Sequence, residues 1–518
     1  MEDKTNTSLN EPKGHEMADH KEIIVEDVAG DAAANGQGLT GFENLTVWQT
    51  IITFKVASLL CFLISISAAA DGYQIALAGN IIANKGFVNE FGSHHLADGS
   101  VVLASNALSS FNAMGSLGQI IGMTTLPFMS NRLGRKFSMF YYWSILAMSI
   151  MTECLARTWG VWAFAKLLGG IGVGCMQITI PGYISEISPP KSRGTMLMLY
   201  GLWWITGQFF APVALQVMSK NRPFDWLTPI YTQWAQIGLM FIIYLYLPES
   251  PVWLASRNKA EQAKKALQRI YKGASVNIDQ QYELIALNLE HERAFAAQNK
   301  NERWYAIFKG VDGFRTLVAC WTLVAQMFIG LGVFLGYGTY FFQQAGFADP
   351  FKITCITSGI NIGCSVVVMY LADVTGRRWL ACYGTTLCWL TYAGRTDIGL
   401  VANGATGWGF IGEIPSQRLR HFTSGFAAAI SCVIGVILNL VVPKMINTQD
   451  WNWGLKTCWF YAGIGAPFTV AIWFLIPETT GRSAAELDEL FERKIRPWRF
   501  KKTTTLTQRL VEAEKATV

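Results

Sequence analysis

The feature that most constrains this chain is a series of apolar runs, each as long as a helix that crosses a bilayer. Residues 51–70 are apolar or small except for one lysine, and residues 137–156 form a similar run that contains one glutamate. About 20 apolar residues in an α-helix span a hydrocarbon core of ~30 Å. Only 15% of the residues are charged, whereas soluble domains carry about 25%. The sequence therefore predicts an all-α membrane protein and argues against a string of soluble domains.

The apolar runs predict twelve spans, six before and six after a polar segment at residues 250–315. Within that segment, residues 259–271 and 280–298 have helical patterning, so we expect short helices outside the membrane. The chain is thus divided into an N-terminal six-helix bundle at 46–249 and a C-terminal bundle at 316–480. The expected spans are 51–78, 101–129, 137–156, 159–187, 195–218, 226–247, 316–343, 353–372, 379–393, 398–412, 423–446 and 456–476.

Lysine and arginine in the loops predict the orientation of the chain. They cluster at 131–136, 191–193, 377–378 and 418–420 and in the 250–315 segment, and all five regions fall on one side of the membrane. The positive-inside rule places that side in the cytosol, together with both termini.

The two ends of the chain are expected to be cytosolic tails. Residues 1–45 are polar, acidic and rich in Gly and Asn, which predicts disorder. Residues 481–518 form the second tail. We expect a multi-pass protein of the plasma membrane, with an internal membrane as the alternative.

Three short motifs occur in both halves of the chain in the same order, which predicts two homologous six-helix bundles. Such repeats are typical of transporters whose halves rock about a site near the midplane of the membrane. The pairs are 131–136 (NRLGRK) with 373–378 (DVTGRR), 186–189 (EISP) with 413–415 (EIP), and 248–250 (PES) with 477–479 (PET).

The C-terminal copy is shorter than the N-terminal copy. Gly134 to Glu186 is 52 residues, whereas Gly376 to Glu413 is 37, a deficit of 15. Two full spans need about 40 residues plus a turn, so the ninth and tenth spans within residues 379–412 are predicted to be truncated. A single helix there would leave eleven crossings and move the basic loop that follows to the outside, so we favour a stunted hairpin.

Together these motifs resemble the sugar porter branch of the major facilitator superfamily, and the resemblance extends over residues 45–495. It implies a major facilitator fold of two six-helix bundles. It also implies transport of a hexose, disaccharide or α-glucoside by alternating access. The matching residues are 131–136, 181–183 (PGY) with Glu186, 193–194, 248–254, 373–378 and 477–483.

Three further segments resemble fungal maltose and α-glucoside permeases more narrowly. They are residues 336–342 (GYGTYFF), 413–420 and 451–453 (WNW).

The charged residues of the repeated motifs are interpreted as a cytosolic latch. Bidentate pairs between arginine and carboxylate are strong, and we expect them to form when the cytosolic side is closed. Their loss would favour the inward-open state. The alternative is that these charges only fix the topology. The latch candidates are Arg135, Glu186, Arg193, Glu249, Arg377, Arg378, Glu413, Arg418 and Glu478.

Sugar recognition requires a few amide and hydroxyl groups in a largely apolar wall. Gln326 lies four residues before Gly330, as the sugar-binding glutamine of the family does, whereas Met327 replaces a second glutamine that is common there. A lone amide inside a span can instead bond a neighbouring helix, and a tryptophan can serve packing. The candidate sugar-binding residues are Gln326, Tyr337, Asn361, Trp408, Asn439 and Gln208.

The resemblance is weakest at the positions for proton coupling. Proton-driven relatives carry an aspartate after Gly-Tyr in span one and an arginine in span four, where this chain has Gln74 and Lys166. Glutamine cannot carry a proton. Asp71 lies about one helical turn before Gln74 and could substitute, or it could be a packing residue. The coupling candidates are Gln74, Asp71 and Lys166, and uniport and proton symport both stay open.

The expected partners are a sugar, the lipid bilayer and, for a symporter, protons. The sequence has no His/Cys metal cluster, phosphate loop or nucleophile elbow, so no enzyme, metal or cofactor is expected. The net charge of +6 reports topology, not nucleic-acid binding. Two alternatives remain: a transport-inactive product of a truncated gene or gene model, and a non-transporting sugar sensor, although only a short tail follows the last motif.

Overall fold

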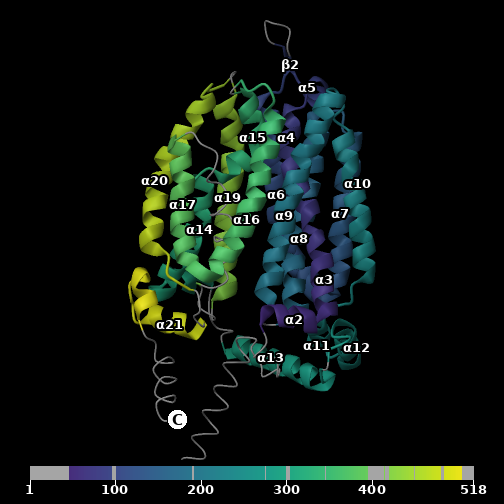
Figure 1. The fold of residues 1–518 in the computed structure, drawn as a ribbon, viewed down its shortest axis with the longest axis vertical. Helices are drawn as coiled ribbons and strands as arrows, with labels where there is room; N and C mark the ends of the chain where they lie inside the picture. The colour runs from purple at the N-terminus through teal and green to yellow at the C-terminus, as the bar shows by residue number, and fades with distance from the viewer. Residues whose placement is uncertain are drawn as a thin grey trace, which may run out of the picture.

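The computed structural model describes residues 46–95, 101–189, 192–274, 276–298, 304–344, 346–394, 414, 419–447, 450–479 and 484–503. Two helical bundles stand side by side, and the helices of the linker lie below one end of them (Figure 1). We call this end the linker side and the opposite end the far side. The prediction of an all-α membrane protein is confirmed. In the described part of the chain, the sheet consists of two antiparallel strands of two residues each.

Each of the six predicted spans of the N-terminal bundle corresponds to helix, except that the second was predicted to begin at residue 101, where strand β2 lies, and α6 begins at Ser105. Two consecutive helices, α3 and α4, make up the first span, and α5 and the strand pair β1–β2 follow it on the far side (Figure 1). The elements are α2 Val47–Thr53, α3 Lys55–Ile66, α4 Ala68–Asn80, η1 Ile81–Ala83, α5 Lys85–Phe91, β1 His94–His95, β2 Val101–Val102, α6 Ser105–Leu133, α7 Arg135–Leu155, α8 Trp159–Ile187, α9 Arg193–Asn221 and α10 Thr228–Tyr246.

The linker is helical, and the C-terminal bundle follows it. The linker helices are α11 Pro251–Ser256, α12 Ala260–Ile270 and α13 Ile278–Gln298. The remaining elements are η2 Trp304–Phe308, α14 Gly310–Phe328, α15 Leu331–Gln344, α16 Pro350–Thr375, α17 Arg377–Gly394, α19 Arg420–Ile446, η4 Gly454–Lys456, α20 Thr457–Leu475, α21 Ala484–Glu492 and η5 Pro497–Lys502.

Six of the described helical stretches are long and apolar enough to cross a membrane, as judged by length and composition. They are Lys55–Ala83, Trp159–Ile187, Arg193–Asn221, Pro350–Val368, Gly425–Ile446 and Thr457–Leu475.

The predicted seventh span, 316–343, is interrupted in the structure. The helix α14 ends at Phe328, and α15 begins at Leu331. Between them Gly330 has φ +91°, which glycine adopts without steric cost. The sequence pattern suggested one helix because the apolar residues continue through the break.

The predicted shortening of the ninth and tenth spans falls mainly beyond the described residues. The ninth span, α17, has 18 residues, and its counterpart α7 has 21. The predicted tenth span, 398–412, lies outside the described residues. The helix α17 runs from the linker side toward the far side (Figure 1), and the carbonyl of Ile414 accepts a hydrogen bond at 2.8 Å from Nε of Arg315 on α14. The stunted hairpin itself lies outside the described residues and stays a prediction.

Glycine lets helices of the N-terminal bundle approach one another at backbone distance. A Cβ at Gly118 of α6 would meet the carbonyl oxygen of Leu167, and a Cβ at Gly170 of α8 would meet that of Gly115. On α4, a Cβ at Gly72 would meet the carbonyl of Trp204 on α9. Small residues at helix contacts are the usual way to pack helices in a bilayer, where water supplies no hydrophobic drive.

The same turn is built twice, once in each bundle. Gly134 joins α6 to α7 with φ +104°, and Gly376 joins α16 to α17 with φ +97°. A Cβ at Gly134 would lie 2.6 Å from Glu249 Oε2, and a Cβ at Gly376 would lie 2.7 Å from Glu478 Oε2. The repeated glycine and the repeated Pro-Glu motif are therefore one structural unit: a glutamate from the end of the last span packs on the turn.

We predict that Gly134→Ala destabilises the protein. The backbone at this position (φ 104°, ψ 168°) is essentially restricted to glycine and costs other residues about 1–3 kcal/mol. The added Cβ would also displace Glu249. The apparent melting temperature of a fluorescent fusion in detergent measures the effect.

The matched control is Gly160→Ala in α8, where a Cβ would meet nothing within 4 Å. Equal melting temperatures for the two variants would contradict this account of the turn.

Candidate functional site

One face of α6 carries small polar residues that contact the C-terminal bundle. Ser105, Ser109, Asn112 and Ser116 follow a spacing of four, three and four residues, which places them on one side of a helix. The contacts are Asn447 Nδ2 to Ser105 Oγ at 2.5 Å, Ser109 Oγ to the carbonyl of Leu440 at 3.0 Å, Asn112 Nδ2 to the carbonyl of Gly336 at 3.2 Å, and Asn439 Nδ2 to Ser116 Oγ at 3.0 Å.

The helix α4 makes a second contact between the bundles. Thr339 Oγ1 donates to Asn80 Oδ1 at 2.6 Å, and the backbone of Gly79 lies against that of Gly336 on α15. We call these contacts of α4 and α6 with the C-terminal bundle the inter-bundle seam. Its residues lie at the end of α4 and in the first half of α6. These parts of the helices are on the far side, and the two sets of ribbons diverge toward the linker side (Figure 1).

Two of the predicted sugar-binding residues lie together at the seam. Tyr337 on α15 is buried and donates its hydroxyl to the carbonyl of Asn439 on α19 at 3.2 Å. The side chain of Asn439 in turn donates to Ser116 across the seam. These two candidates therefore link the C-terminal bundle internally and join it to the N-terminal bundle.

The other sugar-binding candidates are on separate helices. Gln326 is buried on α14, and Asn361 is half-buried on α16. Gln208 is buried on α9, and its Nε2 has no hydrogen-bond partner among the described residues. Trp408 lies outside the described residues.

Two of the coupling candidates meet at Glu153, a carboxylate that the sequence analysis did not select. Glu153 lies on α7, and its Oε1 pairs with Lys166 Nζ of α8 at 2.9 Å, with side chains 0% and 3% exposed. Gln74 Nε2 of α4 lies 3.4 Å from the same oxygen. On the other side, Gln233 Nε2 of α10 donates to Oε2 at 3.2 Å. Four helices thus converge on one buried carboxylate.

Small and aromatic residues complete this cluster. Gln74 Nε2 also donates to Ser149 Oγ at 3.3 Å, and a Cβ at Gly169 would collide with the Gln74 amide. The Lys166 ammonium lies 4.4 Å from the centroid of the Trp162 ring. Trp162 is fully buried and packs against Phe87, Phe91, Phe111 and Trp226.

Asp71, the third coupling candidate, has different partners. It is fully buried on α4, and its Oδ2 accepts a hydrogen bond from Gln177 Nε2 of α8 at 3.0 Å. Its Oδ1 has no hydrogen-bond partner in the described part of the chain. The N-terminal bundle therefore contains two buried carboxylates, one paired with a buried cation and the other bonded to an amide.

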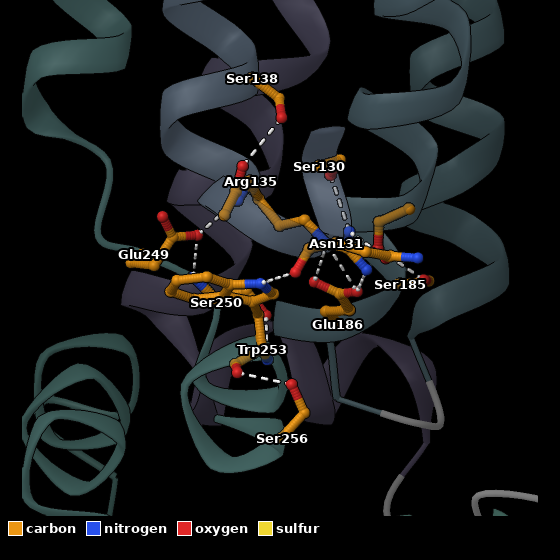
Figure 2. A network of polar contacts seen from close by, with 12 residues as sticks. Ser130, Asn131, Arg135, Ser138, Ser185, Glu186, Glu249, Ser250, Trp253 and Ser256 are labelled. Atoms are coloured by element: carbon orange, nitrogen blue, oxygen red, sulfur yellow. Dashed lines mark hydrogen bonds and ion pairs between the residues drawn. The ribbon is translucent and has the colours of Figure 1, made fainter. Parts of the chain in front are cut away.

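The latch residues of the N-terminal bundle form a network on the linker side (Figure 2). Arg135 binds Glu186 at the end of α8 in a bidentate manner, with NH2–Oε1 at 2.8 Å and Nε–Oε2 at 3.3 Å. Arg135 NH1 also donates to Ser130 Oγ at 2.7 Å. Glu249 accepts the backbone N–H groups of Arg135 at 2.9 Å and of Ser250 at 2.9 Å. Glu249 therefore caps the start of α7 rather than pairing with an arginine side chain.

The equivalent residues of the C-terminal bundle are described only in part. Glu478 accepts the backbone N–H of Arg378 at 3.4 Å, as Glu249 does for Arg135, and Arg378 NH2 donates to the carbonyl of Trp473 at 2.8 Å. Glu413 and Arg418 lie outside the described residues, as does the side chain of Arg377. In the other bundle, Arg193 Nε is buried without a hydrogen-bond partner among the described residues.

The linker side of the C-terminal bundle contains an ion pair that the sequence analysis missed. Arg315 on α14 is 3% exposed, and its NH2 lies 2.5 Å from Asp488 Oδ1 of α21. Its Nε donates to the carbonyl of Ile414 at 2.8 Å, and its guanidinium lies over the ring of Phe491. This arginine fixes the C-terminal helix against the base of the bundle. The described ion pairs on the linker side all lie within one bundle or within the linker.

A family model described as "Sugar (and other) transporter" matches residues 60–404 and 398–491. The chain belongs to this sugar transporter family. The two matched segments meet at 398–404, inside the stretch that the sequence analysis found to be shortened. Family membership also confirms that the chain is a transporter and not an enzyme.

Relatives of this transporter are found in yeast and in a filamentous fungus. It is 28% identical over 523 residues to a general alpha-glucoside permease of Saccharomyces cerevisiae, covering 95% of this chain and 84% of the relative. It is 27% identical over 520 residues to the MFS transporter fmqE of Aspergillus fumigatus, covering 92% and 96%. An inward open conformation of the xylose transporter XylE from E. coli matches with a TM-score of 0.67 and 20% identity, covering 84% and 99%. The major facilitator fold is thus confirmed.

We predict that Arg135→Lys lowers the melting temperature of the protein. Lysine keeps the charge but loses the planar fork that binds Glu186 through two nitrogens. With both side chains less than a quarter exposed, the loss is expected to be on the order of 1–2 kcal/mol. Thermal unfolding in detergent measures it.

Arg157→Lys is the control, because its pair with Glu90 spans 3.6 Å and its side chain is 63% exposed. If both variants melt at the temperature of the wild type, the Arg135 network contributes nothing to stability.

Proposed function

We propose that this protein carries a sugar, namely a hexose, disaccharide or α-glucoside, across a membrane by alternating access. The observation that carries the proposal is the match to the sugar transporter family over nearly the whole chain. The general alpha-glucoside permease and maltose permeases of Saccharomyces cerevisiae among the relatives support the substrate class. The two-bundle fold supports the mechanism, since such bundles can rock about a shared midplane site.

The inter-bundle seam supports an assignment of the state. Its hydrogen bonds occupy the far half of α6 and α4. The Arg135–Glu186 pair on the linker side lies within one bundle, so it can stay formed when that side is open, unlike the latch pairs expected from the sequence. With the basic loops on the linker side, the positive-inside rule makes that side cytosolic. The arrangement is then an inward-facing transporter, with both termini in the cytosol, and the plasma membrane is the proposed location.

Gln326, Tyr337, Asn361, Trp408, Asn439 and Gln208 are the proposed sugar-binding residues. Tyr337 and Asn439 lie at the seam, so a sugar bound there would contact groups that also hold the bundles together on the far side. Gln208 has an amide without a partner on α9, and a buried donor of this kind gains most from a ligand oxygen. These residues come from both bundles, as alternating access requires.

The shortened segment favours a second candidate, a transport-inactive product of an interrupted gene. The stretch from Gly376 to Glu413 is 15 residues shorter than its N-terminal counterpart, and the family match is divided into two segments that overlap at 398–404. Sequencing the transcript across this stretch separates the two candidates. Restoration of about 15 apolar residues, the length by which a full span pair is short, would indicate a faulty gene model.

We predict uptake of at least one sugar by yeast that lacks its own sugar transporters and expresses this protein. The panel is radiolabelled glucose, maltose and methyl α-glucoside, and correct folding is checked by monodisperse elution from a sizing column. Gln326→Ala is expected to raise KM for the transported sugar, because it removes an amide from the binding wall. A well-folded, surface-expressed protein that carries none of the three sugars would refute the proposed substrate class.

We also predict that a covalent cross-link between the two bundles at the inter-bundle seam blocks transport. A short thiol cross-linker between Ser105→Cys and Asn447→Cys would hold the far side closed, and uptake should fall to background and recover with reductant. Each single-cysteine variant, treated identically, controls for the ten native cysteines. Full uptake by the cross-linked protein would show that the seam does not open during the cycle.

A further inference from the structure

The ion pair of Glu153 and Lys166 is the most deeply buried one in the described part of the chain. Its side chains are 0% and 3% exposed, and those of the other described pairs are exposed by up to 70%. Ionisable residues inside membrane spans are rare because desolvation is costly, and they mark ion or proton pathways more often than not. An ion pair of this kind is a poor way to gain stability, since apolar residues of similar volume do as well or better.

The pair lies where two positions singled out by the family resemblance meet. Gln74 and Lys166 stand at the two positions expected to hold an acid and a base, and both contact Glu153 Oε1. A carboxylate therefore lies beside both of these residues, although it comes from the third span and not from the first. Gln74 lies beside this carboxylate and donates a hydrogen bond to it.

Protonation of Glu153 would remove the counter-ion of Lys166, the cation that faces it. Gln74 and Tyr73 face it from α4, Lys166 from α8, and Gln233 from α10. Cys154 adjoins it on its own helix. Lys166 is the single cation in this set. When Glu153 takes up a proton, Lys166 loses its counter-ion and keeps only the face of Trp162.

The helix α4 connects this site to the contact between the bundles. Gln74 touches Glu153, and five and six residues further along α4, Gly79 and Asn80 touch Gly336 and Thr339 of the other bundle. A change in the position of Gln74 is therefore passed along one rigid helix to the inter-bundle seam. Coupling requires only that proton binding favour one of the two arrangements of that seam.

We propose that Glu153 is the proton-binding carboxylate of a proton–sugar symport cycle, with Lys166 as its counter-ion and Gln74 as its link to the inter-bundle seam. The inference rests on the proposed sugar transport. In each cycle the carboxylate accepts one proton from the outside and releases the same proton to the cytosol, so that no other reactant is consumed. Asp71 has no part in this exchange and bonds to Gln177.

The test compares accumulation with exchange in yeast, using whichever of radiolabelled glucose, maltose and methyl α-glucoside the wild type carries. The wild type is expected to concentrate the sugar, to lose accumulation with a protonophore, and to alkalinise an unbuffered medium when sugar is added. Glu153→Gln should abolish accumulation and alkalinisation but keep counter-exchange of sugar. Glu90→Gln, a carboxylate exposed on the same side of the protein, is the control and should behave as the wild type.

A relocation variant separates a proton-binding role from a structural one. In Gln74→Glu/Glu153→Gln the carboxylate moves to α4 beside the same lysine, and protonophore-sensitive accumulation should return. If the ion pair has only a structural role, this variant should fold but should not regain protonophore-sensitive accumulation. If Glu153→Gln fails to fold, the relocation variant decides alone: recovered coupling supports the proposal, and folded but uncoupled protein overturns it.

Two results would overturn the proposal while leaving sugar transport intact. One is a wild type that transports without accumulation or alkalinisation. The other is a Glu153→Gln variant that still accumulates sugar, and if Asp71→Asn then loses coupling, Asp71 is the proton-binding group. Absence of any transport by the wild type would instead remove the proposed function itself.

Discussion

Inside a bilayer no water is present to bind polar groups, so each polar group has to find its partner on the same helix or on a neighbouring one. This constraint organises the N-terminal bundle. The Glu153 carboxylate receives donors from α4, α8 and α10, and Gly169 of α8 leaves room for this cluster. At Gly169 a side chain would occupy the space of the Gln74 amide. The Gln74–Glu153 contact therefore depends on the absence of a side chain at residue 169.

The internal repeat has a structural meaning that is independent of any transport step. In both bundles a glutamate at the end of the last span packs on a glycine turn between the second and third spans, and it accepts backbone N–H groups at the start of the following helix. A carboxylate is favoured at a helix N-terminus by the helix dipole. The arginine that follows the N-terminal glycine is then free to bind Glu186, which ties a third helix to the turn.

The parts of the structure that repeat a short-range pattern could be predicted from the sequence. Long apolar runs predicted the spans of the N-terminal bundle, and basic loops with repeated motifs predicted two bundles. The break at Gly330 could not be predicted in this way, because the residues on both sides of it are apolar and the glycine is one among 48. The stripe of Ser105, Ser109, Asn112 and Ser116 has a readable helical spacing, but its partners lie more than 200 residues away in sequence and are known only from the fold.

The candidate site shows the same division. Lys166 and Gln74 were selected by their positions in motifs, but Glu153 belongs to no motif and was visible only as a lone glutamate in an apolar run. Its cost inside the membrane was a signal, although nothing in the sequence indicated which cation or amide it would meet. Lys166 and Gln74 reach the same Glu153 oxygen, so the carboxylate that was expected on span one is found on span three. In a helical bundle, residues from different helices can place a carboxylate at the same point in the structure. The presence of Gln74 at the position of the expected aspartate therefore does not mean that this place in the bundle lacks a buried carboxylate.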